Sequence, residues 1–507
     1  MKRATKWLLA GGALAAITLL FLDVADARPG GGQGYSGGGG HGGGSSGGGD
    51  GGGELLYIIF RILLELIIYK PEIGIPVTIV VIGIAIFVYL HAQHQKRGLT
   101  DWDSGPPSVY KGPPPKLDKL KRTDEDFSTV LFDDFVYRLF AAAHEGRGRE
   151  GGLEALAPYI SQSARGTLKL VEPTGVPVAG VIVGAMRVTG VNAPKNSHNN
   201  EGVLNYSHVT LQFEACFTAG QPGNERGFFV VESWTLSRGA DVLTKPPGKA
   251  QEFPCPNCGA PFEQSADQKC SYCDEVVDNG KFDWIVKSVN RTHTAMGGPL
   301  LTGTVPERGT DLETYMDSDV GHQWGVLSAE DPALTQDSIQ ARIFLIFEQL
   351  NKSWQELDLA EARPYVSDGM FDYLQYWVTA YKQQGLRNKL DDMKITQWTV
   401  CKVISDKYYD AITCRVWAKG KDYTVNDKTG KVVGGSKSMN RPYTEYWTLI
   451  RNAETRGEAS GKKECPACGA DMKINMAGSC EYCGAHLTSG EFDFVLSKIE
   501  QDDSYRG

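Results

Sequence analysis

The spacing of hydrophobic residues changes along the chain, and the change predicts where helices give way to strands. Apolar side chains recur at helical spacing behind Thr123-x-x-Asp126, which resembles a capping box, and predict a helix over about 124–144. A second helix is expected over 153–170. The period then falls to two, so strands are predicted over 180–191, 205–217, 228–238 and, after an interruption, 282–286. A sheet therefore follows the helices.

The second half of the chain repeats this order. A helical stripe runs from Ile339 to Trp354, and the segment 364–367 (Pro-Tyr-Val-Ser) parallels 158–161 (Pro-Tyr-Ile-Ser). Strands are predicted over 394–404, 411–418 and 443–451, with a closing strand at the end. We therefore predict two homologous α+β domains joined by a loop, over 124–290, 334–501 and 291–333 respectively.

The N-terminus has the layout of a targeting segment. Lys2, Arg3 and Lys6 precede an apolar run, and small residues before Arg28 offer a cleavage site, so a secretory signal peptide is predicted over 1–27. An uncleaved signal anchor is the alternative. The following tract, 28–53, is rich in glycine, cannot bury a core, and is expected to be disordered.

Two apolar segments and a linker follow. Within 54–69 the charged residues Glu54, Arg61 and Glu65 fall on one narrow stripe, which predicts an amphipathic helix over 54–70 lying in a membrane interface or against another helix. Residues 73–92 carry no Asp, Glu, Lys or Arg and would be ~30 Å long as a helix, enough to cross the hydrocarbon core. The linker 93–123 is rich in proline and lysine. By the positive-inside rule its cations predict a single-pass protein with cytoplasmic C-terminal domains and the glycine-rich tract outside; binding acidic lipids is a second role open to them.

Composition narrows the class of protein. With 507 residues the chain is long enough for two or three domains, and 22% charged with 41% hydrophobic residues is typical of globular proteins. A net charge of -9 gives no sign of a nucleic-acid partner. Three of the eleven cysteines, Cys216, Cys401 and Cys414, stand alone and are expected to be buried apolar residues. The sequence does not indicate an oligomeric state.

The other eight cysteines form two copies of one pattern, in which two Cys-x-x-Cys turns are separated by eleven residues. They are Cys255, Cys258, Cys270 and Cys273 in the first copy, and Cys465, Cys468, Cys480 and Cys483 in the second. Four thiolates suit a tetrahedral Zn²⁺ ion, so two zinc ribbons are predicted, over 253–279 and 463–489. Four cysteines leave no position for water or substrate, so both ions are expected to be structural. Reduced cysteines also agree with a cytoplasmic location.

Other polar and aromatic residues are given structural roles. Asp283 and Asp493 follow the two ribbons and are expected to cap or brace the exit rather than to act as paired acids. Trp234 and Trp447 are expected in the core rather than as a ligand platform. The pair His91 and His94 is expected at the membrane interface rather than on a metal.

Taken together, these motifs resemble a known family. The membrane segment, the proline-bearing spacer, the Pro-Tyr-[Ile/Val]-Ser stretch, the Glu-x-Trp-Thr-Leu strand, the Cys-Pro-x-Cys-Gly turn and the Gly-x-Phe-Asp exit are similar to those of bacterial membrane proteins with the Tim44-like domain. The resemblance covers about 125–290 and 333–500. It implies two tandem cone-shaped domains similar to nuclear transport factor two, with helices packed on a curved antiparallel sheet, and a place in the bacterial inner membrane.

The function expected from these features is binding rather than catalysis. The mitochondrial members bind acidic lipid head groups and recruit a chaperone to an import translocon, but this chain differs from them in its N-terminus, duplication and ribbons. We therefore expect a membrane-anchored, non-catalytic adaptor for membrane lipid or a protein partner, linked to protein translocation or membrane-protein assembly. An enzyme that uses the cone pocket and an envelope structural protein are the alternatives.

Overall fold

The computed structural model describes residues 115–457 and 464–502 apart from short gaps (222, 248–252, 264–268, 297–300, 302–309, 311, 476–477 and 486), together with 505, 507 and a few positions between 67 and 78. The predicted signal segment 1–27, the tract 28–53, the pair His91 and His94, and most of 54–70, 73–92 and 93–123 lie outside the described residues. Among the residues that are described, no helix has the length and apolar character needed to span a membrane.

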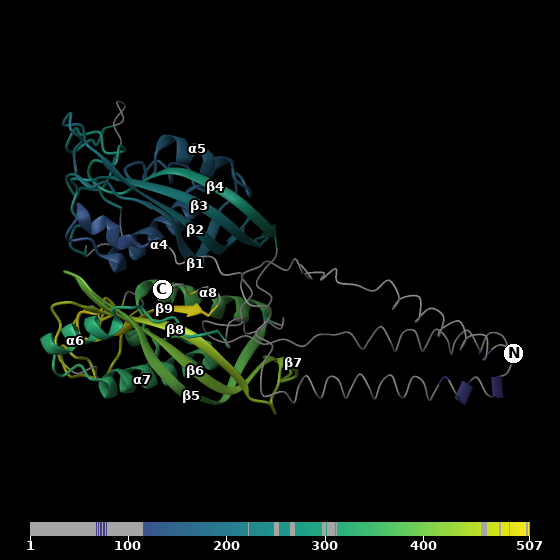
Figure 1. Ribbon diagram of the computed structural model, residues 1–507. Helices are drawn as coiled ribbons and strands as arrows, with labels where there is room; N and C mark the ends of the chain where they lie inside the picture. Colours follow the sequence, from purple (N-terminus) through teal and green to yellow (C-terminus); the bar gives the residue numbers. More distant parts are fainter. Residues whose placement is uncertain are drawn as a thin grey trace. The chain divides into compact units, whose positions relative to one another are not determined.

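The first half is a four-stranded antiparallel sheet preceded by helices (Figure 1). Its strands are hydrogen-bonded in chain order, β1-β2-β3-β4, so each strand lies beside its neighbours in sequence. The elements are η1 (Leu117–Arg122), α4 (Thr129–Gly146), α5 (Gln162–Leu170), β1 (Val178–Asn192), β2 (Tyr206–Ala219), β3 (Arg226–Gly239) and β4 (Ile285–Met296). The first cysteine pattern therefore lies between β3 and β4 in the sequence.

The second half repeats the arrangement, with longer first and second strands and a shorter last strand. Its antiparallel sheet has the order β5-β6-β8-β9, and the short strand β7 pairs with β6. The elements are α6 (Val320–Glu330), α7 (Gln336–Glu356), η2 (Arg363–Tyr365), α8 (Asp368–Gln384), β5 (Leu386–Ser405), β6 (Tyr409–Asn426), β7 (Val432–Gly435), β8 (Arg441–Asn452) and β9 (Val495–Gln501). The mixed α+β class with antiparallel sheets is confirmed.

Several predicted boundaries were wrong; among the strands, β5 begins at Leu386 rather than 394, and β6 ends at Asn426 rather than 418. The first helix begins at Thr129, because the hydroxyl of Ser128 accepts from the backbone N–H of Leu131 and Thr123 lies in a turn. The second helix begins only at Gln162, after a run of turns through 151–159. The loop expected over 291–333 is partly regular, because β4 extends to Met296 and α6 follows.

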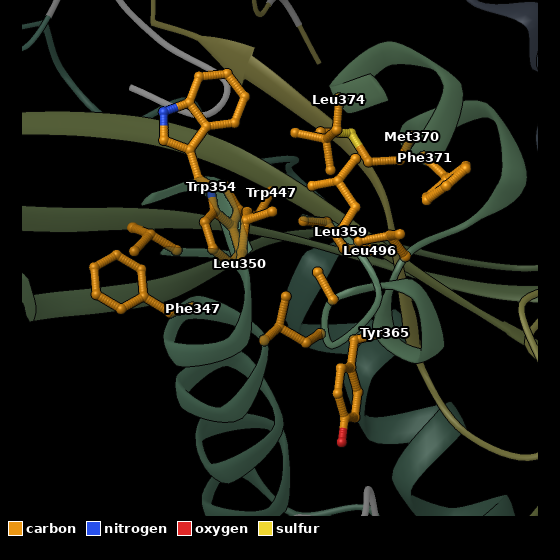
Figure 2. Close-up of a cluster of buried hydrophobic side chains, with 14 of the residues drawn as sticks. Phe347, Leu350, Trp354, Leu359, Tyr365, Met370, Phe371, Leu374, Trp447 and Leu496 are labelled. Carbon is orange, nitrogen blue, oxygen red and sulfur yellow. The ribbon is translucent and has the colours of Figure 1, made fainter. Parts of the chain in front are cut away.

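Each sheet carries its own apolar core. Phe140, Phe213 and Trp234 pack together in the first half, with ring centroids 4.6 to 5.6 Å apart. Figure 2 shows the corresponding cluster of the second half, which contains Trp354 and Trp447. Trp234 and Trp447 are at most 2% exposed, so the prediction that they belong to the core is confirmed. The lone cysteines are buried as expected: Cys216, Cys401 and Cys414.

The two halves also repeat one buried ion pair. Asp124, just before α4, lies 2.5 Å from Arg238 at the end of β3. Asp331, just before α7, lies 2.8 Å from Arg451 at the end of β8. In each half the aspartate also accepts a backbone N–H from the segment after the strand, that of Thr244 or of Gly457. Each pair ties the entry of a helix to the strand that leads into a cysteine pattern.

The halves pack against each other within one compact unit. Val130 and Leu131 of α4 join a cluster of second-half residues that includes Tyr408 and Ile450. The Tyr408 hydroxyl donates to the backbone carbonyl of Thr244 over 3.0 Å. The segment that precedes the first cysteine pattern is therefore also in contact with the second half.

Candidate metal centres

Each Cys-x-x-Cys turn is built by a repeated pair of backbone hydrogen bonds. In the first turn, the N–H of Gly259 donates to the Cys255 carbonyl over 2.9 Å, and the N–H of Cys255 donates to the Ala260 carbonyl over 2.8 Å. The turn at Cys465 has the same two bonds, to Gly469 and Ala470, at 2.8 and 2.7 Å. The turns that begin at Cys270 and Cys480 repeat the pattern. The thiol groups of both cysteines in a turn are thereby directed to one side.

The residue after the second cysteine must adopt a positive φ. Gly259, Gly469 and Gly484 have φ between +73 and +75°, which glycine adopts without steric cost. The fourth turn has Asp274 there at φ +58°, and Asp is among the few other residues that tolerate this region. The glycine in the Cys-Gly pairs of the sequence is thus explained by the geometry of the turn.

These turns bring the predicted ligands together as two separate groups. Within each group the four sulfur atoms lie within 4.8 Å of one another, and no further group of three or more possible ligands is found among the described residues. The eight cysteines therefore form two clusters, which we call cluster 1 (Cys255, Cys258, Cys270, Cys273) and cluster 2 (Cys465, Cys468, Cys480, Cys483).

The sulfur separations fit a metal better than disulfides. Cys255 and Cys273 are 3.8 Å apart at Sγ, Cys258 and Cys270 are 4.0 Å apart, and Cys465 and Cys483 are 3.9 Å apart. Four ligands at about 2.3 Å from a tetrahedral ion lie about 3.8 Å from one another, whereas a disulfide bond is about 2.0 Å long. Both clusters are therefore able to hold a metal ion.

One thiol in each cluster is readily ionised. A hydrogen bond from the Asn257 side chain lowers the pKa of Cys273 to about 7. A backbone hydrogen bond involving Cys483 lowers the pKa of Cys480 to about 7. Since the thiolate is the form that binds a metal, each cluster offers a ligand near neutral pH before any ion is present.

Side chains of the sheet domains hold the metal-binding hairpins in place. In the first half, the Tyr159 hydroxyl donates to the Pro254 carbonyl over 2.7 Å, and the Lys245 ammonium donates to the carbonyls of Pro256 and Phe282. In the second half, the Thr488 hydroxyl donates to Asp368 over 2.8 Å. The hairpins are thus anchored at their bases rather than tethered by flexible loops.

The two aspartates after the clusters are placed as braces. Asp283 accepts the N–H of Trp284 over 2.8 Å, and Asp493 accepts that of Phe494 over 2.7 Å. Asp493 also lies 3.2 Å from Arg342 of α7, while Asp283 lies 3.8 Å from Lys245. These contacts agree with a structural role at the exit of each hairpin.

Sequence reasoning missed the buried pairs Asp124–Arg238 and Asp331–Arg451, which fix the strand before each cluster. The signal was present in the duplication: each aspartate precedes a repeated helix, and each arginine ends a repeated strand. A comparison of the two halves for matching charges would have found them.

The turn geometry gives a direct prediction. Replacing Gly469 by Ala should weaken metal binding at cluster 2 about fivefold, because an L-residue at φ +73° costs roughly 1 kcal/mol. No atom lies within 4 Å of the added methyl group, so the cost is conformational alone. Gly321→Ala in α6 is the matched control, because its added methyl is equally free and its φ is not positive. Competition with a chromophoric chelator measures the effect, and equal affinity in both variants would contradict the role of φ.

Comparison with known proteins supports a family for part of the chain. A search of curated proteins finds no match for this sequence. One part of the second half, from the end of α6 to just beyond β8, does match a protein family. Residues 327–460 match the family model of the Tim44-like domain, so this part of the second half is similar to that family.

Proposed function

We propose that this protein is a membrane-anchored, non-catalytic adaptor that binds a partner protein in protein translocation or membrane-protein assembly. The proposal rests on the match of residues 327–460 to the Tim44-like domain, which is associated with binding functions at membranes. The single-pass topology with cytoplasmic domains, and acidic lipid as a second ligand of the basic linker, belong to the same proposal.

The first half belongs to the proposal as a second domain of the same kind. The repeated ion pairs and the repeated strand order support this assignment. A further repeated contact joins the start of the second helical segment to the last strand: Ile160 bridges Val286 in the first half, and Val366 bridges Leu496 in the second. The same local framework therefore serves both halves.

The metal-binding hairpins are proposed as the contact surface for the partner, with zinc as the ion. Each hairpin presents a tyrosine between the last two cysteines, Tyr272 and Tyr482, and both side chains are 58% exposed. Tyrosine is enriched at protein interfaces because it combines a large apolar ring with a polar hydroxyl. A closed four-cysteine site holds such a side chain in a fixed position without taking part in chemistry.

The test is capture of partners by the full-length protein from detergent-solubilised membranes. The variant with Tyr272→Ser and Tyr482→Ser is expected to lose partners that the wild-type protein retains, while both metal equivalents and the unfolding midpoint stay unchanged. Leu170→Ser is the matched control, because Leu170 is 80% exposed and belongs to α5 rather than to either hairpin. If the double variant captures the same partners as the wild type, the hairpins are not the contact surface.

A further inference from the structure

The interiors of the two halves share one buried Glu-Trp hydrogen bond but differ in the residues around it. In the first half, the Trp234 indole donates to Glu232 over 2.7 Å; in the second, the Trp447 indole donates to Glu445 over 2.9 Å. Across the strand ladder, Arg291 stands opposite Glu232, whereas Gln501 stands opposite Glu445. The shared Glu-Trp pair therefore belongs to the common framework, and Arg291 is particular to the first half.

The adjoining helix differs in the same way. Arg147 and Trp354 follow the N-cap residues Ser128 and Thr335 by the same number of positions. Trp354 is fully buried, and its indole donates to Asn388 over 3.0 Å, so an aromatic ring fills this place in the second half (Figure 2). The first half has a guanidinium there instead. The framework does not require a cation at this position, because the second half has none.

The charged groups around Arg147 leave one edge of its guanidinium without a hydrogen bond. Glu232 is fully buried and is matched by Arg291, whose Nε and Nη2 lie 2.7 and 2.6 Å from its carboxylate. His144 Nε2 lies 3.2 Å from the same carboxylate, and burial lowers the pKa of His144, so the imidazole is neutral at pH 7. Two carboxylates, those of Glu232 and Glu172, therefore favour the charged form of Arg147, but neither accepts a hydrogen bond from its Nε or Nη2.

Arg147 also has hydrogen-bond donors to spare. Its Nη1 donates to the carbonyls of Val171 and Pro173, over 2.7 and 2.9 Å. Its Nε and Nη2 are buried and have no hydrogen-bond acceptor among the described residues. These two nitrogens form one edge of the guanidinium, with two parallel N–H bonds that match the two oxygens of a carboxylate.

The surroundings restrict what can bind there. The guanidinium groups of Arg147 and Arg291 lie 5.3 and 5.8 Å from the centre of the Phe217 ring. The loop 171–175 covers them, and it is held by the two bonds from Arg147 and by one from Arg291 to the Glu172 carbonyl. Because two carboxylates already balance the two guanidinium groups, a monoanion adds less excess negative charge than a phosphate dianion, and the two oxygens of a carboxylate match the parallel donors.

We propose that the first half binds the carboxylate of a small organic acid at the Nε–Nη2 edge of Arg147, beneath the loop 171–175. Arg291 adds positive charge and fixes the loop, and Phe217 forms the apolar side of the site. The site is separate from both metal clusters and does not depend on their role in partner binding. The second half, where Trp354 occupies the matching position, has no such site.

The experiment is thermal unfolding of the full-length protein in detergent at constant ionic strength, with sodium chloride replaced stepwise by sodium acetate. Acetate should raise the unfolding midpoint of the wild type, and acetamide, which has the same shape without the charge, should not. Arg147→Gln should weaken the acetate affinity at least about tenfold, since it removes a charge-assisted, two-pronged contact. Phosphate should act no more strongly than chloride.

Two further variants keep the test decisive. Arg149→Gln removes a charge two residues away whose side chain is 68% exposed, and it should respond to acetate as the wild type does. Arg147→Lys keeps the charge but loses the parallel donors, so its acetate response should be intermediate. It takes the place of Arg147→Gln in the test if that variant fails to fold. Retention of both metal equivalents reports on folding. An acetate effect no larger than that of chloride, or one equal in the wild type and Arg147→Gln, would overturn the proposal and leave buried water as the partner of Arg147.

Discussion

Replacing Cys468 by Ser is expected to remove one of two metal equivalents and to unfold the hairpin of cluster 2, while cluster 1 keeps its ion. Structural zinc sites contribute roughly 10–16 kcal/mol of apparent binding free energy to folding, far more than the few apolar contacts of these hairpins supply. Among the residues of this hairpin that the structure describes, the apolar cluster around Cys465 and Cys480 contains one other buried residue, Leu487. Without its ion, this hairpin has too little core to remain folded.

Metal analysis after dialysis, combined with limited proteolysis of residues 463–489, measures the result. Cys258→Ser should have the opposite effect: cluster 1 should lose its ion, and the hairpin of cluster 2 should stay resistant to proteolysis. Cys216→Ala is the control, because its thiol is buried away from both clusters and its loss should leave two metal equivalents. Loss of both ions from either serine variant would show that the two clusters are not independent.

The metal clusters were the part of the structure that the sequence predicted best, for a physical reason. A Cys-x-x-Cys turn is local: the backbone bonds around Cys255 and Cys465 span four or five residues and depend on a glycine that is visible in the sequence. The alternation of apolar residues in the strands is likewise local. Predicted and observed strand boundaries consequently agree best where the strand is bounded by turns, as in β3 and β8.

Features that depend on distant residues could not be predicted in this way. Thr123 and Asp126 were assigned to a capping box, but Thr123 lies in a turn, and the carboxylate of Asp124 beside it binds Arg238 and Thr244. The helix α6 lacks a strong apolar stripe of its own, and it is stabilised by packing Leu327 into the core of the second half. The buried charges of Arg147 and Arg291 were missed because the carbonyls and the carboxylate that bind them lie far away in the sequence.

The family match ends just before the second metal cluster begins. The matched residues end at 460, before Cys465, so the second cluster lies outside the residues that match the family model. Arg451 lies inside the matched part, and its Nη1 lies 3.3 Å from the carbonyl of Gly457, at the start of the segment that leads to cluster 2. This residue therefore connects the domain to the hairpin.

Replacing Arg451 by Met is expected to destabilise the second half by about 3–5 kcal/mol, the cost of leaving buried carboxylates without their cation. Arg451 is 1% exposed, with Nη1 2.8 Å from Asp331 and Nη2 3.2 Å from Asp410, and both carboxylates are buried. Its guanidinium also lies 4.5 Å from the centre of the Phe494 ring. Urea unfolding at pH 7 measures the effect as a lower midpoint at an unchanged slope.

Two further substitutions separate the charge effect from the loss of packing. Adding Asp331→Asn to Arg451→Met removes one of the stranded charges, so it should recover part of the lost stability, whereas Asp331→Asn alone should destabilise. Lys352→Ala is the control: its ammonium lies 2.7 Å from Glu361, and the two side chains are 48% and 49% exposed, so losing this pair should cost far less. If Arg451→Met costs no more than Lys352→Ala, the buried pair does not hold the strand. If the double substitution is no better than Arg451→Met, the loss comes from packing against Phe494 rather than from unpaired charge.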